Sequence, residues 1–334
     1  MIRYSFRLKD YRIALKGFAR LLNLPILKKK LWFPPHIGEG YIYASSIGQD
    51  ISYAILDFTF KDDLLFARKK TSDYGLGFSL SQIEISEYVK VSEPGNSIID
   101  KSPRFHNVFL SSTNYDLDLT ISKNSVTKMV VVMFSPALVK KCLKKEILLD
   151  LMMYTERGLE NMYKEPITFE YRQLLDDIFN TDTEAPISNL ILQNRILLLT
   201  EKLLTNFLEK DAGDHTGKPH KIKERDFKAL KEVEELLTHR DLEKFPSIEV
   251  LSRTAMMSST KLKTKFKRVY GMKLYEYYNR NRMEKAREML QSGKYSVKEV
   301  GMEIGFSNLS NFAKAFKKEF GILPNEMLRM NSVL

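Results

Sequence analysis

The spacing of apolar residues changes near residue 135, and the change predicts two kinds of structure along the chain. Between residues 51 and 134, apolar residues alternate with polar ones, as in Leu117-Asp-Leu-Thr-Ile121, and turn-forming clusters separate the runs. Many short strands with this period of two are typical of a β-sandwich or barrel. Ser135-Pro136 predicts a helix start, and beyond it apolar residues recur every three or four positions, over 169–179 and 187–207 for example.

A polar stretch with Gly and Pro residues, 211–220, predicts a linker between domains. We therefore expect a β-rich domain over 1–145, a helical element over 146–210, the linker, and an all-helical domain over 221–334. The segment 187–207 has a wide apolar face, which suits packing on its own domain and on a second subunit. Residues 12–22 fit a short amphipathic helix.

The helical third contains one spacing twice. The first set is Ile248, Leu251, Leu262, Phe266 and Gly271, and the second is Val297, Val300, Phe312, Phe316 and Gly321. Each set follows a serine, Ser247 or Ser296, that suits a helix N-cap, and each ends at a glycine that suits a C-terminal cap. Each predicts a short helix, a tight turn and a longer helix, which is the helix-turn-helix plan. A helix from Lys273 to Gln291 connects the two units.

The outward faces of the two longer helices match in chemistry, with small polar residues early and cations later. On a helical wheel the outward and flanking residues are Thr260, Lys261, Lys263, Thr264, Lys267 and Arg268 in the first unit and Ser310, Asn311, Lys314, Lys317 and Lys318 in the second. Residues 220–334 carry 24 Lys+Arg against 15 Asp+Glu, most of the net charge of +11. Such helices fit the major groove, so we expect these residues to bind double-stranded DNA.

These residues resemble the AraC/XylS transcription regulators. The resemblance is strongest over residues 296–324, where this chain has the serine-valine start, the Gly305-Phe306 turn and a Phe-x3-Phe-x4-Gly helix followed by Pro324. The resemblance covers about the last 100 residues. This chain departs from the family at Ser252 and Gly301, where alanine is common, and at Met256, where glycine is frequent. The order of segments from Asn107 to Glu209 is similar to the subgroup that includes siderophore-responsive regulators.

The resemblance implies an α+β protein: an N-terminal cupin-like barrel or sandwich with a helical dimerisation element, and a C-terminal double helix-turn-helix domain. It implies a sequence-specific regulator of transcription that forms a homodimer, is controlled by a small-molecule effector in the N-terminal domain, and contacts RNA polymerase if it is an activator. The effector-binding residues are unknown from the sequence. Aromatic residues such as Trp32, Tyr53 and Phe78 suit either a ligand cavity or the barrel core.

An alternative is an enzyme or a redox sensor that uses the C-terminal domain to localise on DNA. The N-terminal half has only His36 and His106 before the linker and no recognisable nucleophile cluster, so we expect no catalysis, metal or cofactor. The single cysteine, Cys142, lies on a predicted helix and suits a packed thiol, although the neighbouring Lys140, Lys141 and Lys144 would favour a reactive thiolate. The basic N-terminal segment fits neither a signal peptide nor a membrane span, so we expect a cytoplasmic protein without a membrane partner.

Overall fold

The computed structural model describes residues 1–156, 158–161, 167–212, 224–238 and 244–331. They divide into two compact units, Met1–Lys221 and Ile222–Leu334. Most of the predicted linker, residues 213–220, lies outside the described residues. Within the described part of the chain, no helix is both long and apolar enough to cross a bilayer.

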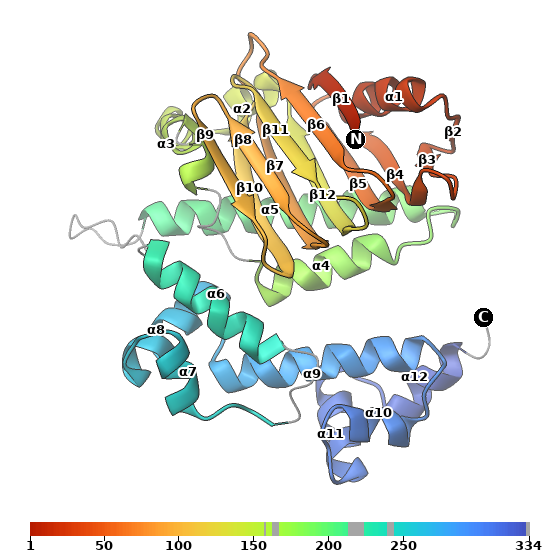
Figure 1. Cartoon of the computed structure of the whole chain (residues 1–334), viewed down its shortest axis with the longest axis vertical. Coiled ribbons are helices and arrows are strands. Elements are labelled where there is room, and N and C mark those ends of the chain that lie inside the picture. Colours follow the sequence, from red (N-terminus) through yellow and green to blue (C-terminus); the bar gives the residue numbers. More distant parts are fainter. Residues whose placement is uncertain (157, 162–166, 213–223, 239–243, 332–334) are drawn as a thin grey trace. The chain divides into compact units, whose positions relative to one another are not determined.

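The N-terminal unit combines strands and helices (Figure 1). Its strands are β1 (Ile2–Arg7), β2 (Ile26–Leu27), β3 (Lys30–Trp32), β4 (Gly38–Ile47), β5 (Ile51–Phe60), β6 (Leu64–Lys69), β7 (Leu76–Glu84), β8 (Val89–Glu93), β9 (Asn96–Asp100), β10 (Arg104–Ser112), β11 (Leu117–Ile121) and β12 (Val126–Phe134). Its helices are α1 (Tyr11–Leu22), α2 (Pro136–Cys142), α3 (Lys145–Glu156), the 3-10 helix Gly158–Asn161, α4 (Phe169–Phe179) and α5 (Ser188–Ala212).

The described strands form two sheets that face each other. The smaller sheet has the order β1-β6-β11-β8-β9, and the larger has the order β10-β7-β12-β5-β4-β3-β2. Strand β1 pairs parallel with β6, whereas the other pairings among the described strands are antiparallel. The predicted α+β fold class is thus confirmed.

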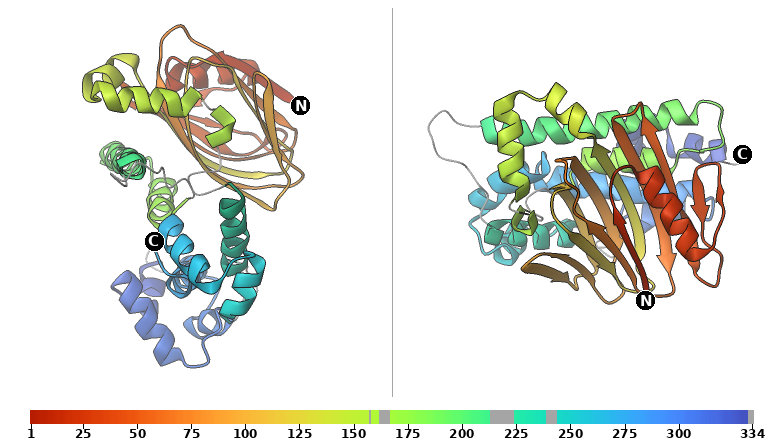
Figure 2. Two further views of the ribbon diagram at one scale, coloured as in Figure 1. Left: turned by 90° about the vertical axis from the view of Figure 1, so that its left-hand side faces the viewer. Right: turned by 90° about the horizontal axis from the view of Figure 1, so that it is seen from above.

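The larger sheet is buried on both faces, which explains the continuous apolar run in β12. Met129 and Val131 point into the core between the sheets, which α1 also helps to close. Val130 and Val132 belong to the opposite core, where α4 and α5 pack together and against the sheet (Figures 1 and 2). A strand covered on both faces carries apolar residues at successive positions rather than alternate ones.

The sheets begin earlier in the chain than the pattern predicted, because β1 to β4 precede residue 51. The predicted helix over 12–22 is confirmed as α1, whose N-cap Asp10 accepts a hydrogen bond from the backbone N–H of Arg12. Ser135 likewise caps α2, accepting from the backbone N–H of Leu138 at 3.0 Å. These helix starts follow local capping chemistry, which is visible in sequence.

The secondary-structure elements that the structure describes in the C-terminal unit are all helices. Its helices are α6 (Glu224–Thr238), α7 (Ile248–Thr254), α8 (Ser259–Tyr270), α9 (Leu274–Gln291), α10 (Val297–Glu303), α11 (Leu309–Phe320) and α12 (Pro324–Asn331). The predicted caps are confirmed: the Ser247 and Ser296 side chains accept from the backbone N–H groups of Val250 and Glu299. Gly271 and Gly321 both end their helices at φ +77.

Candidate DNA-binding surface

Helix α8 is the longer helix of the first helix-turn-helix unit, which α7 and α8 form, and its buried face fixes which side chains point outward. Helices α10 and α11 form the second helix-turn-helix unit. Leu262 and Phe266 are fully buried, and the Phe266 ring meets Tyr277 of α9 with 5.4 Å between ring centroids. The six predicted residues of this helix are exposed, namely Thr260, Lys261, Lys263, Thr264, Lys267 and Arg268. The apolar spacing therefore placed the outward face of α8 correctly.

Helix α11 repeats this arrangement in the second unit. Phe312 and Phe316 are fully buried in a core that α9 and α10 share. The Asn308 side chain caps the helix and accepts from the backbone N–H groups of Ser310 at 2.8 Å and Asn311 at 3.4 Å. The five predicted residues are exposed, namely Ser310, Asn311, Lys314, Lys317 and Lys318.

Both longer helices are fastened to α9, which sets their spacing. Arg280 of α9 forms an ion pair with Glu319 of α11 at 2.7 Å. Arg282, also on α9, donates from Nε to the backbone oxygen of Ile304 at 2.6 Å, and its guanidinium lies 4.6 Å from the centre of the Phe306 ring. Arg282 thereby ties α9 to the turn of the second unit, so the two outward faces belong to one packed body.

The first helix-turn-helix unit differs from the second because two of its lysines bond to an acidic residue. Asp226 of α6 accepts from Lys261 Nζ at 3.2 Å and from Lys265 Nζ at 2.5 Å. The hydrogen bond from Lys265 is the main cause that holds the pKa of Asp226 below its usual value. In the second unit, Asn311 and Ala315 stand where α8 has Lys261 and Lys265. Lys261 is thus exposed as predicted, but it is tethered to an acidic partner.

Asp226 is the residue of this surface that sequence reasoning missed. Its side chain is only 12% exposed, and it joins two lysines one helical turn apart on α8. The sequence offered no specific signal for this contact, because α6 carries several acidic residues and Asp226 lies 35 and 39 residues before the two lysines. Contacts over such separations depend on the packing of α6 against α8, which the periodicity alone does not give.

The turns of the two units have the same backbone path but different residues. Gly305 has φ +79, and Met256 at the corresponding place has φ +49. The backbone N–H of the next residue bonds back in both turns, from Met257 to Ser252 and from Phe306 to Gly301. Met256 therefore occupies the left-handed region that glycine prefers, and its side chain is 81% exposed.

The exposed cations of α11 are available to a polyanion. Within the part of the chain that the structure describes, Lys314, Lys317 and Lys318 form no ion pair. They follow Ser310 and Asn311 along one helix face, so small polar groups precede unpaired positive charges. That order suits base edges near the start of the helix and phosphates further along.

No group of three or more described His, Cys, Asp or Glu side chains is placed to hold a metal ion. The Cys142 side chain lies outside the described set. The redox alternative therefore stays a prediction that the geometry does not address.

Comparison with known proteins places a helix-turn-helix domain model on residues 251–330. The HTH-type transcriptional regulator MtrA of Neisseria gonorrhoeae is 30% identical over 80 residues, which are 24% of this chain and 27% of that protein. This chain spans about a quarter of the length of the first curated relatives that it matches, 26–27%.

Two solved structures are similar at low overall score. One is a transcriptional regulator with an AraC-type DNA-binding domain from Chromobacterium violaceum, 26% identical, covering 31% of this chain and 93% of that chain with a TM-score of 0.29. The other is ToxT from Vibrio cholerae, 17% identical, covering 84% of this chain and 98% of that chain with a TM-score of 0.30.

Proposed function

We propose that this chain, whose C-terminal unit is an AraC-type helix-turn-helix domain, is a sequence-specific DNA-binding regulator of transcription. The single observation that carries the proposal is the pair of matched outward faces on α8 and α11, held by one connecting helix. A basic face alone suits many polyanions, but two helix-turn-helix units in register suit duplex DNA.

The connecting helix supports contact with two successive segments of the major groove. Helix α9 has 18 residues, which corresponds to about 27 Å of length. One turn of DNA spans about 34 Å, so units fastened along α9 are spaced for two neighbouring groove segments on one side of the duplex. The polypeptide would then bind both segments without a second copy.

The outward residues divide by their place along each helix. We assign base contacts to Thr260, Lys263, Thr264, Ser310, Asn311 and Lys314, because they lie early in their helices. We assign phosphate contacts to Lys267, Arg268, Lys317 and Lys318, which lie later. Lys261 joins the surface through its exposed stem, while its ammonium bonds to Asp226.

The N-terminal unit would supply dimerisation and regulation. Leu190 and Leu197 lie two helical turns apart on α5 and are 67% and 42% exposed. Exposed apolar side chains on one face of a helix suit the pairing of two copies of the chain. A dimer would also double the length of DNA that the protein contacts. We further propose that a small-molecule effector binds in this unit, and that an activating form would contact RNA polymerase.

Selection from a random duplex library tests the proposal with the full chain. We expect enrichment of a motif with two parts whose centres lie about 10 base pairs apart. Thr264 and Lys314 occupy equivalent positions in the two units, so Thr264→Ala and Lys314→Ala form a matched pair. Each variant should relax a different part of the motif. A selected pool that shows no motif, from protein shown to be folded, would refute sequence-specific binding.

A further inference from the structure

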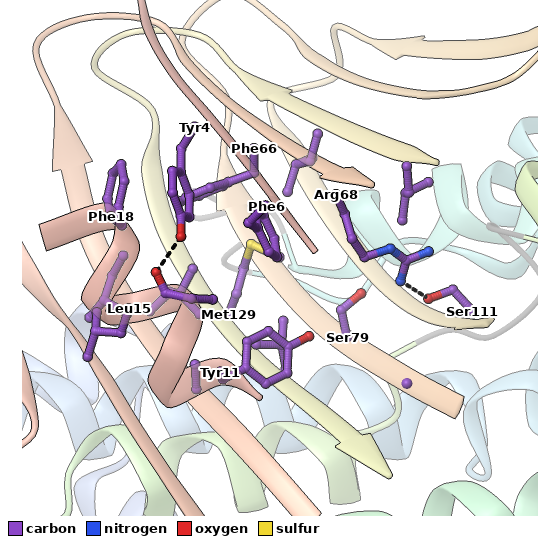
Figure 3. A pocket seen from close by; sticks show the side chains of 18 of the residues that line it. Tyr4, Phe6, Tyr11, Leu15, Phe18, Phe66, Arg68, Ser79, Ser111 and Met129 are labelled. Carbon is purple, nitrogen blue, oxygen red and sulfur yellow. Dashed lines mark hydrogen bonds between the residues drawn. The ribbon is translucent and has the colours of Figure 1, made fainter. Parts of the chain in front are cut away.

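A cavity of about 150 Å³ lies in the N-terminal unit, between the two sheets and α1. Its walls are apolar over most of their area and include Phe6, Leu15, Phe18, Phe66 and Met129. In Figure 3 these residues occupy one end and the middle of the view, while Arg68, Ser79 and Ser111 lie toward the other end. The cavity therefore has an apolar body and a polar end.

Among the described residues that line this cavity, Arg68 is the only one with a charged side chain. Its residue is 9% exposed, and burial lowers the pKa of the guanidinium. Nη1 donates to Ser111 Oγ at 3.0 Å and Nη2 donates to the backbone oxygen of Ser112 at 2.7 Å. Nε is buried and has no hydrogen-bond partner within the described residues.

The neighbouring acid of this chain does not neutralise Arg68. Asp116 accepts instead from Lys69 Nζ at 3.1 Å and from the backbone N–H of Lys70 at 2.8 Å. Tyr115 also lies beside Arg68, with its ring 5.4 Å from the guanidinium carbon, but it brings no negative charge because burial raises the pKa of its hydroxyl to about 12. Within the described ranges, Arg68 is thus a buried cation without an ion-pair partner, an arrangement that is costly unless an anion joins it.

We propose that this cavity binds a small molecule with a compact apolar body and a single carboxylate that pairs with Arg68. An apolar cavity of about this volume accommodates a benzene-sized body. A guanidinium binds a carboxylate through its N–H donors. Nη1 and Nη2 of Arg68 each carry two N–H bonds, and the hydrogen bonds to Ser111 and Ser112 use one from each. One cation matches one negative charge, so dianions such as phosphate esters are disfavoured. This inference rests on the proposed effector control and names the chemical class of that effector.

Calorimetry on the full chain, without DNA, tests the chemical class. The probes are phenylacetate, cyclohexanecarboxylate and 4-methylpentanoate, each compared with its neutral amide. We expect at least one acid to bind in a one-to-one ratio, and its amide to bind at least about tenfold more weakly because the charged partner of Arg68 is lost. Absence of binding by all three acids at millimolar concentration would overturn the proposal.

Variants separate the charge of Arg68 from the shape of the cavity. Arg68→Met should fold, because an apolar chain of similar length replaces an unpaired charge, and should lose the preference for acid over amide. Lys69→Met is the matched control, since its ammonium pairs with Asp116 and it does not line the cavity. Ala54→Leu fills the cavity and should weaken acid and amide alike. If Arg68→Met binds the acids as tightly as the unmodified chain does, the proposal is wrong.

DNA binding, measured separately by fluorescence anisotropy, distinguishes this inference from the proposed function. Motif binding together with no acid binding would remove the cavity proposal and leave the regulator. Acid binding that depends on Arg68, together with no DNA binding, would remove the regulator and leave the site.

Discussion

Replacing Lys314 with alanine gives a sharp test of how α11 divides its contacts with DNA. Lys314 and Lys318 lie four residues apart on one face of the helix, a separation of about 6 Å along its axis. Both are exposed, and neither forms an ion pair within the described residues. Because neither side chain contributes to a core, each substitution should change the free energy of unfolding by less than about 0.5 kcal/mol.

The two substitutions should weaken DNA binding in different ways. Lys314→Ala should cost about 1–3 kcal/mol on the preferred motif, which is about 5- to 150-fold in Kd, and should relax the preference at a few base pairs. Lys318→Ala should weaken all duplexes similarly and reduce the slope of log K against log salt by about 0.9, the value for one phosphate contact.

Fluorescence anisotropy on the selected motif, its single-base variants and a scrambled duplex, at several salt concentrations, measures both effects. Thermal melting by circular dichroism checks that both variants remain folded. Equal losses on every duplex from both substitutions would refute the division between base and phosphate contacts.

Three further predictions concern stability and assembly. Asp226→Asn should lower the free energy of unfolding by about 1 kcal/mol at pH 7. Because Lys265 holds the pKa of Asp226 low, the stabilisation should be lost as the pH falls through that lowered pKa. A stability difference between the variant and the unmodified chain that stays constant from pH 7 to acid would contradict this prediction. Met256→Gly should raise the free energy of unfolding by about 0.5–1 kcal/mol in urea titrations, since it relieves a left-handed backbone and removes an exposed side chain; a loss would count against strain at this turn. Leu197→Glu should convert a dimer to a folded monomer, as followed by sedimentation and circular dichroism, and an unmodified chain that sediments as a monomer with and without DNA would remove the dimer.

The C-terminal unit was predictable because its signals are local. Serine caps at Ser247 and Ser296, glycines at the helix ends, and Leu or Phe residues every three or four positions each act within a few residues. They specify the helices and their buried faces directly. The ion pair from Asp226 to Lys265 was not predictable, because it joins helices that are distant in sequence.

The N-terminal unit was predictable only in class. Alternation gave strands between residues 51 and 134, but β1 pairs with β6 some 60 residues later, so its register has no local signal. Of the aromatic residues considered for a cavity, Phe78 lines it, whereas Tyr53 lies in the core facing the helices and Trp32 is half exposed. Periodicity separates the two faces of a strand, but it does not say which face meets a helix and which meets the other sheet.

The central claim is that residues 221–334 form a DNA-binding domain, and duplex binding by this isolated segment tests it most directly. Circular dichroism would first establish that the segment is folded, and anisotropy with a labelled duplex at increasing salt would follow. Because α8 and α11 each carry exposed cations on their outward faces, we predict measurable affinity for duplex DNA at low salt. That affinity should fall steeply as added salt weakens the contacts with phosphates. A folded segment without affinity for duplex DNA even at low salt would contradict the account.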